Sequence, residues 1–563
     1  MKIAKRVNDE QLIVRDIKRL HAMGYAQELF RAMGGFANFA ISFTIISVVS
    51  SIVSLFGTAI TTSGFVAGSI GWPLIVLFVL FVALSMAELA SAYPTAGGLY
   101  YWASMLGGPA WGWFTGWFNL IGQFAITAGL DYGLAVSIDV WLNAFFPAVP
   151  AKLGSIMGID PATQWFTLAI YALVLISHVV LSIFGVRLVA LLNDVSVWVH
   201  ILGVLLIGGG VAVAAWLGIQ FGGVNFTMHV ASAPLNTAHA LFTVDQKYNQ
   251  SGFPIWYAFL LGLLLAQYCF TGYDASAHMS EETIGADTRA PRGIIMSVLV
   301  SAFAGYAMLM GLLAAAPDLT KAAGFINPVL YILQSRLGFL AGTLIFTLAL
   351  LAMFFAGMAS VTTNARMLYA FSRDGAIPFS RLWHKLDHNR EPRNAVILSA
   401  ICAFLLAVPT VINFVAYIAI TSITTIGLYI AYGIPILLRL CAKDFKPGPW
   451  HLGRWSKPIA VVAVVWIVLI SILFMLPTLN PITIVTFNYT LVVVLGALAI
   501  LSVWWMVSVR HWFKGPHAQG TEAALEEIEK EVGETTLVHE PAMVPASLQT
   551  LDGLDGIVGV GGE

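Results

Sequence analysis

Charged residues are scarce in this sequence. They make up 10% of its 563 residues, against about 25% in soluble domains, while apolar residues reach 59%. The net charge of −1 favours neither a nucleic-acid partner nor an acidic one. The 17 Trp residues are typical of the aromatic belts at the two faces of a membrane. Together these values exclude an ordinary soluble protein and predict a protein embedded in a lipid bilayer.

Cysteine and the motifs of enzymes are also lacking. Cys269, Cys402 and Cys441 lie in or beside apolar runs without C-x-x-C spacing, which excludes a disulfide framework and a metal motif. No H-E-x-x-H, G-x-S-x-G, Walker lysine motif or cysteine–histidine cluster occurs. We therefore predict that the protein is not an enzyme and has no catalytic residue, no bound metal and no cofactor other than a coupling ion.

Twelve apolar runs are long enough to cross a bilayer, for which a helix needs about 20 residues. The first run follows a basic stretch but precedes no small-residue cleavage site, so we interpret it as a true span and not as a signal peptide. The predicted spans, numbered 1 to 12, are 36–60, 68–93, 110–141, 163–186, 195–218, 254–277, 293–316, 338–364, 394–411, 413–439, 457–477 and 486–509.

Basic residues are distributed unevenly between the two sides of the predicted bundle. If the N-terminus is inside, all but four of the 28 Lys and Arg residues face inward. Basic loops are retained in the cytoplasm, and an even number of spans places both chain ends on one side. We expect a multi-pass protein of the plasma membrane, the inner membrane in a bacterium, with both termini cytoplasmic. The four exceptions are Lys152, Lys247, Lys321 and Arg336.

The sixth run turns polar before it has crossed the membrane. It begins near Ile255 and loses its apolar character between Phe270 and Thr283, a stretch that contains Gly272 and Asp274. A carboxylate inside a span is costly and generally serves a function. The usual arrangement is a broken helix, whose unwound backbone and half-helix ends bind a solute or an ion at membrane depth.

Three sequence blocks resemble those of the amino acid-polyamine-organocation transporters. Residues 84–101, LSMAELASAYPTAGGLYY, are similar to the end of that family's second span and its following loop. Residues 364–378, NARMLYAFSRDGAIP, together with Pro392, resemble the loop after its eighth span. EET at 281–283 and APRG at 290–293 are similar to the sixth-span region of the amino acid/choline branch, which includes GABA and choline permeases. The resemblance covers roughly residues 20 to 510.

The resemblance implies an all-α membrane protein with a fold like that of the bacterial leucine transporter, in which two inverted repeats of five helices are followed by two more helices. A short amphipathic helix at 522–532, EAALEEIEKEV, is one interpretation of the C-terminal tail, and a solvated acidic tail is the other. The implied parts are a cytoplasmic arm (1–35), the first repeat (36–218), an extracytoplasmic loop (219–253), the second repeat (254–440), spans 11 and 12 (441–510) and a flexible cytoplasmic tail (511–563).

The resemblance further implies that spans 1 and 6 form a broken pair that binds the substrate. Span 1 carries five hydroxyl side chains within ten residues, between Ser42 and Ser51. Many relatives have Gly-x-Gly at this break; here serine hydroxyls would satisfy the freed backbone groups, or else bond only within their own helix. The candidate substrate-binding residues are Ser47, Val48, Val49, Ser50, Gln123, Tyr268, Phe270, Thr271, Gly272 and Asp274.

Asp274 follows the expected break directly, as in the family pattern F-x-G-x-[ED]. Its carboxylate would bind a substrate ammonium, hold a coupling proton, or pin the broken helix by accepting amide hydrogen bonds. Tyr268 and Phe270 would close the site from outside by covering the solute; ordinary packing in the membrane core is the alternative for both.

His200 in span 5 is our candidate for energy coupling. It falls where some proton-coupled relatives place a lysine that stands in for a sodium ion between spans 1 and 8. An imidazole titrates near neutral pH, so the preferred hypothesis is coupling to protons. Two alternatives remain: a neutral, hydrogen-bonded histidine, and a sodium site built on Ser360 and Thr363 of span 8.

Charged residues near the cytoplasmic ends of several spans are candidates for an inner gate of ion pairs that opens during alternating access. Solvated loop charges are the alternative for each of them. The gate candidates are Glu88, Glu281, Glu282, Arg366 and Arg373. Weaker leads, which interhelical hydrogen bonds explain more simply, are Asp131, His178, Thr421, Ser422 and Thr424.

These features predict a secondary active carrier that imports a small amino acid or amine. GABA-like amino acids are the first candidates, followed by choline, ethanolamine and polyamines. The partners implied are this small solute and the lipid bilayer, with no nucleic acid. A channel or a nutrient sensor on the same fold is the competing class, and only a flux measurement separates the three.

Overall fold

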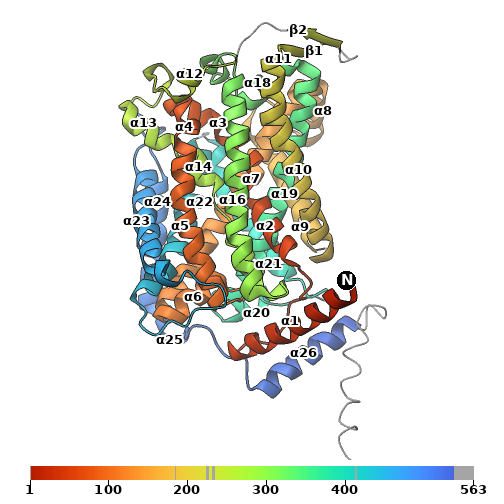
Figure 1. Ribbon diagram of the computed structural model, residues 1–563, viewed down its shortest axis with the longest axis vertical. Coiled ribbons are helices and arrows are strands. Elements are labelled where there is room, and N and C mark those ends of the chain that lie inside the picture. The colour runs from red at the N-terminus through yellow and green to blue at the C-terminus, as the bar shows by residue number, and fades with distance from the viewer. Residues whose placement is uncertain are drawn as a thin grey trace, which may run out of the picture.

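The computed structural model describes residues 2–183, 186–222, 227–230, 235–387, 389–412 and 415–537. In this part of the chain the helices form one upright bundle (Figure 1). Eleven helical segments are long and apolar enough to span a membrane, and Ile255–Cys269 in the sixth predicted span is shorter. The sixth segment is shorter because its helix is broken, as predicted. The all-α, multi-pass prediction is confirmed.

The first six spans include the two broken ones, spans 1 and 6. They are α2 (Gly35–Ile46) with α3 (Val48–Ser63), α4 (Val66–Ser69) with α5 (Gly71–Ala92), α7 (Pro109–Phe145), α9 (Gln164–Ile183), α10 (Val186–Val204) with the π-helix η1 (Leu205–Gly210) and α11 (Val211–Leu217), and α13 (Ile255–Gly262) with α14 (Leu264–Cys269), α15 (Ala275–His278) and η3 (Ser280–Glu282).

The second six spans are unbroken at mid-membrane. They are α16 (Ala286–Ala315), α19 (Phe339–Arg373), α21 (Arg393–Ala407) with η4 (Val408–Val411), α22 (Val415–Cys441), η5 (Gly453–Trp455) with α23 (Ser456–Met475), and α24 (Thr490–Trp504) with η6 (Trp505–Val509) and α25 (Arg510–Trp512).

Short elements cover the two ends of the bundle (Figure 1). The strands β1 (Ile219–Gly222) and β2 (Thr227–Val230) pair antiparallel, with Ile219 opposite Val230. We call the end that carries them the sheet end, and the opposite end, crossed by α1 and α26, the arm end. The remaining elements are α1 (Lys2–Ala22), α6 (Gly98–Gly107), α8 (Ala148–Met157), α12 (Ala238–Phe242), η2 (Gln246–Tyr248), α17 (Leu319–Ala322), α18 (Pro328–Leu337), α20 (Ser380–Trp383) and α26 (Glu522–Leu537).

The two chain ends pack together at the arm end. Helix α26 contains the predicted 522–532 helix and extends it to Leu537. The Glu529 carboxylate lies 2.8 Å from His21 Nε2 and accepts a hydrogen bond of 2.6 Å from the Gln27 amide. Gln519 donates from its backbone N–H to the Gly24 carbonyl. The described part of the tail is therefore docked on the N-terminal arm, where we had expected a flexible segment.

Helix α7 lies at the centre of the bundle because small residues let its neighbours approach closely. A Cβ on Gly122 would lie 2.7 Å from the backbone nitrogen of Leu428 in α22, and one on Gly116 would lie 2.5 Å from the Phe371 ring of α19. This close packing places the polar face of α7 directly against the broken helices.

Candidate functional site

Span 1 breaks at Ser47, between α2 and α3. Ser47 adopts a left-handed conformation with φ 34° and ψ 77°, which is unusual for a residue other than glycine. Its Oγ accepts a hydrogen bond from the Ser50 amide and so caps the start of α3, while Ser51 Oγ donates to the Ile46 carbonyl at the end of α2. Serine hydroxyls therefore satisfy groups that the break leaves free, as the sequence suggested.

Span 6 unwinds between Cys269 and Ala275, next to the break in span 1. Gly272 has φ +83°, and a Cβ there would lie 2.3 Å from Ile45 Cγ2. Both the conformation and the close approach require glycine. The Cys269 thiol faces the Ile46 carbonyl at 3.6 Å. The two breaks lie side by side within the bundle, as expected for a broken pair.

The Asp274 carboxylate is completely buried and accepts four hydrogen bonds from the protein. Oδ1 accepts from the Tyr432 hydroxyl at 2.7 Å, and Oδ2 lies 2.9 Å from Gln123 Nε2. Asn119 Nδ2 and His278 Nε2 each lie 3.2 Å from Oδ2. In this conformation the carboxylate holds the start of α15 against α7 and α22.

His278 links this carboxylate to the loop after span 2. Its Nδ1 lies 2.9 Å from the Ala96 carbonyl, which can only accept a hydrogen bond, so Nδ1 carries a proton. Its Nε2 faces the Asp274 carboxylate. A proton must lie between these two atoms for a hydrogen bond to form. The Asp274–His278 pair is therefore fully satisfied and holds this proton in place.

The unwound backbone of span 6 is covered by side chains. The Tyr429 hydroxyl donates to the Phe270 carbonyl at 2.7 Å, and Thr271 Oγ1 donates to the Tyr268 carbonyl at 2.6 Å. The Phe270 ring meets Trp72 edge to face, with centroids 5.2 Å apart. These contacts bring the predicted aromatic and threonine residues to the break.

The start of α3 presents backbone rather than side chains to the break. A Cβ on Gly305 of α16 would lie 3.0 Å from Val48 Cγ1, and one on Gly203 of α10 would lie 3.2 Å from Val49 Cγ2, so both valine side chains face neighbouring helices. The first amides of a helix have no partner within it. Val48 and Val49 therefore contribute to the candidate site through N–H groups, at the positive end of a helix dipole.

Several site residues were not found by sequence reasoning. Gln267 is buried beside the break, and its amide has no hydrogen-bond partner in the described structure. Spacing could have indicated the others, because each lies one helical turn from a residue that was singled out or from another polar residue. Asn119 precedes Gln123 by four residues, His278 follows Asp274 by four, and Tyr429 and Tyr432 are three apart on span 10.

His200 contacts the break in span 1 directly. Its Nε2 lies 2.8 Å from Ser47 Oγ, and its Nδ1 lies 2.8 Å from the Ser196 carbonyl. The contacts described for His200 are with its own helix and with span 1. Ser360, the proposed sodium ligand, instead hydrogen-bonds Thr127 of α7 at 2.5 Å, and Thr363 Oγ1 is buried without a partner in the described structure.

Four of the five gate candidates form buried ion pairs toward the arm end. Arg373 donates to both oxygens of Glu281, at 2.9 and 3.0 Å. Arg366 lies between two carboxylates, 2.8 Å from Glu282 and 2.7 Å from Glu391. All of these side chains are almost inaccessible to solvent. They join span 6, span 8 and the loop before span 9.

Glu88 does not belong to this group, contrary to the sequence prediction. Its carboxylate accepts hydrogen bonds from Ser456 Oγ and the Leu452 amide, and Arg439 lies 3.8 Å away. These contacts fasten span 2 to spans 10 and 11. The sequence shows only that Glu88 lies near the end of a span, not which neighbouring side chains it meets.

Protonation of Glu391 makes the stability of the folded protein depend on pH. Burial and the nearby charge of Glu282 raise the pKa of Glu391 to about 7, although Arg366 opposes the shift. A raised pKa means that the folded state binds the proton more tightly than the unfolded one. The stabilisation is complete below pH about 4.5 and disappears as the pH rises through about 7.

We expect Glu391→Gln to remove this dependence. Between pH 4.5 and 7, the wild type should lose roughly 3 kcal/mol of unfolding free energy relative to the variant. Thermal unfolding of both purified proteins across this range measures the difference. Parallel curves would contradict the assignment.

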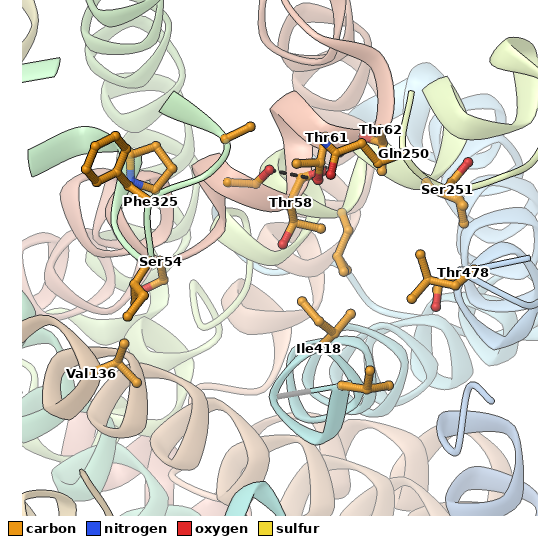
Figure 2. A pocket seen from close by; sticks show the side chains of 18 of the residues that line it. Ser54, Thr58, Thr61, Thr62, Val136, Gln250, Ser251, Phe325, Ile418 and Thr478 are labelled. Atoms are coloured by element: carbon orange, nitrogen blue, oxygen red, sulfur yellow. Dashed lines mark hydrogen bonds between the residues drawn. The ribbon is translucent and has the colours of Figure 1, made fainter. Parts of the chain in front are cut away.

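A cavity of about 560 Å³ lies between the breaks and the sheet end (Figure 2). It is lined by α3, α7, α9, α22 and loops at the sheet end, with hydroxyl and amide side chains such as Ser54, Thr58 and Gln250. Ser54 lies seven residues after the break at Ser47, and Leu264 lies eight residues before Gly272. The structure is thus hollow on the sheet side of the breaks and closed by ion pairs on the arm side.

The sequence of this chain is similar to those of amino acid permeases. A family model described as amino acid permease matches residues 34–498. Amino-acid permease BAT1 of Arabidopsis thaliana is 40% identical over 515 residues, which cover 88% of this chain and 95% of the relative. Its homologue from Oryza sativa is 39% identical over 522 residues, covering 88% and 95%. A putative polyamine transporter of Candida albicans is 26% identical over 533 residues, covering 92% and 91%.

Proposed function

Since the chain belongs to the amino acid permease family, we propose that it is a secondary active carrier that imports a small amino acid or amine together with protons. GABA-like amino acids are the preferred substrates. Choline, ethanolamine or a polyamine, and coupling to sodium, are the alternatives. One relative is named a putative polyamine transporter, which supports the polyamine alternative.

The observation that carries this proposal is the pair of adjacent breaks with opposite half-helix ends. The amides of Val48 and Val49 begin a half-helix, whose positive end suits a substrate carboxylate. The carbonyl end of α14 and the unpartnered amide of Gln267 suit an ammonium group. The cavity on the sheet side and the ion pairs on the arm side correspond to a carrier open toward one side only.

Substrate class is tested by competition against labelled GABA in vesicles that contain the purified protein. We expect zwitterionic amino acids to compete and amines without a carboxylate to compete weakly, because the α3 amides would have no anion to bind. Strong competition by choline or polyamines combined with none by zwitterions would refute the amino-acid assignment. Saturable uptake with counterflow distinguishes a carrier from a channel or a sensor.

Coupling to protons is tested at His200. Its Nδ1 faces a carbonyl and carries the ring proton, so Ser47 Oγ donates to a neutral Nε2. Protonation of Nε2 would reverse this bond at the left-handed residue where span 1 breaks. In sodium-free vesicles with a gradient of one pH unit, the loss of one coupled proton lowers the accumulation ratio about tenfold. We expect this loss for His200→Gln; accumulation that requires sodium even in the wild type would exclude proton coupling.

A further inference from the structure

A second buried acid–histidine pair lies away from the candidate substrate site. Asp131 of α7 and His178 of α9 are both completely buried, and Asp131 Oδ2 lies 3.1 Å from His178 Nδ1. The remaining polar atoms of the pair, Asp131 Oδ1 and His178 Nε2, have no hydrogen-bond partner in the described structure. Neither residue has a role in the function proposed above.

His178 differs in this respect from the other two histidines buried in the spans. Both nitrogens of His278 have acceptors, the Ala96 carbonyl and the Asp274 carboxylate. Both nitrogens of His200 are also occupied. His178 alone among these three retains a nitrogen that no protein group uses. It can therefore gain or lose a proton there without breaking a hydrogen bond to the protein.

The charge of the pair favours binding of a proton. With a neutral His178 donating from Nδ1 to an ionised Asp131, the pair carries a charge of −1 inside the membrane. No Lys or Arg within the described residues forms an ion pair with Asp131. Buried charges without partners are costly. One additional proton, on Nε2 or on the carboxylate, makes the pair neutral.

Helix α19 packs directly on the pair without offering a counter-charge. A Cβ on Gly357 would lie 1.7 Å from Asp131 Oδ1 and 2.7 Å from His178 Cε1, and the Phe354 ring meets His178 at 4.5 Å between centroids. The other helices packed on α7 and α9 offer few titratable groups near this level. These groups are Tyr132 of α7, Tyr171 of α9, Tyr268 of α14, Tyr417 of α22 and Cys402 of α21, whereas Arg393 lies at the arm end of α21 beside Glu391.

A polar stripe on α7 connects the pair with Asp274. Asn119, Gln123, Thr127 and Asp131 follow one another at intervals of four residues, so they lie along one face of the helix. The first two bind the Asp274 carboxylate. Thr127 donates to the Gln123 carbonyl at 3.1 Å and meets Ser360 of α19.

The spacing of these residues along α7 also shows where the Asp131–His178 pair lies between the two ends of the bundle. Asp131 lies eight residues, about 12 Å along the helix, beyond Gln123, and five residues, about 7.5 Å, before Val136, which lines the cavity. The pair thus lies between the candidate substrate site and the sheet end.

We propose that Asp131 and His178 form a second proton-binding site, which takes up one proton from the sheet side in each transport cycle. This inference rests on the proposed function, because it supposes a proton-coupled carrier. The α7 stripe connects occupancy of the pair to the hydrogen bonds that hold Asp274.

The test compares Asp131→Asn and His178→Gln with the wild type in sodium-free vesicles. With an imposed gradient of one pH unit, each variant should accumulate substrate about tenfold less, because one coupled proton is lost. Counterflow at equal pH, which needs no proton gradient, should stay close to that of the wild type, because neither side chain belongs to the candidate substrate site. Combination with His200→Gln should lower accumulation by about another tenfold. Two exposed residues serve as matched controls: Asp160→Asn in the turn before α9 and His239→Gln on the short helix α12.

Each result of these measurements either supports or overturns the second proton-binding site. If both pair variants accumulate substrate as the wild type does, the second site is overturned. If a folded variant loses accumulation and counterflow equally, the pair has a structural role and the proposal is also overturned. If the wild type itself does not respond to the pH gradient, proton coupling fails and the second site fails with it. Infrared difference spectra provide a readout independent of transport. On lowering the pH, the wild type should show a protonation band that both variants lack, in addition to the bands of other buried acids such as Glu391 that all three proteins share. Identical spectra from the wild type and both variants overturn the proposal.

Discussion

Replacement of Gly272 by alanine is expected to reduce uptake by about 100-fold while the protein still folds. The φ of +83° costs an alanine roughly 1–2 kcal/mol. The new methyl group would also lie 2.3 Å from Ile45 Cγ2, so the two breaks could not keep their present separation. A displacement of about 1 Å at a reacting or binding centre is enough for a loss of this size. Uptake into vesicles at saturating substrate measures it.

Gly158→Ala is the matched control for this prediction. Gly158 also has a positive φ, +68°, but a Cβ there would meet no atom within 4 Å. The control therefore carries the conformational cost without the steric clash, and its uptake should remain near that of the wild type. Equal losses in both variants would mean that backbone strain, and not the contact between the breaks, explains the result. Normal uptake by Gly272→Ala would show that the breaks need not be in close contact.

Replacement of Arg366 by glutamine is expected to be the most destabilising single change at the arm end. Arg366 is 1% exposed and is shared by Glu282 and Glu391. Its removal would leave two buried carboxylates facing each other without a cation. Breaking a buried ion pair in this way costs about 3–5 kcal/mol. The unfolding temperature of the purified protein should fall clearly, and uptake should fall with it because span 8 is no longer fastened to span 6.

Two further variants define the cause of the Arg366 effect. Arg381→Gln removes an exposed guanidinium on α20 and should leave stability unchanged within about 0.5 kcal/mol. Glu391→Gln combined with Arg366→Gln removes one of the two stranded carboxylates, so it should recover part of the lost stability. No recovery would show that the packing of the arginine side chain, rather than the unpaired charge, accounts for the destabilisation.

Much of the fold could be predicted from the sequence because each span must satisfy its own backbone inside lipid. Long apolar runs therefore indicate helices reliably, and the polar stretch after Ile255 correctly located the break in span 6. The N-terminal arm and the tail were less predictable. Their association depends on contacts such as His21 with Glu529, between residues 508 positions apart, and no local pattern encodes such a pairing.

The candidate site was partly predictable for a similar reason. Gly272, Asp274 and the serines near Ser47 stand out because they are unexpected inside apolar spans. Asn119 and Tyr432 do not, since amides and tyrosines on a span usually serve helix packing. Their role became visible only where both donate to Asp274.

The sequence by itself determined that this chain crosses a membrane many times, where it breaks, and which family it resembles, because hydropathy and local motifs are properties of neighbouring residues. Only the tertiary structure decided which charges meet. It paired Arg366 with Glu282 and Glu391, moved Glu88 to a different group of helices, and joined Asp131 to His178. Electrostatic energy depends on distance in space, and helices far apart in the sequence set those distances.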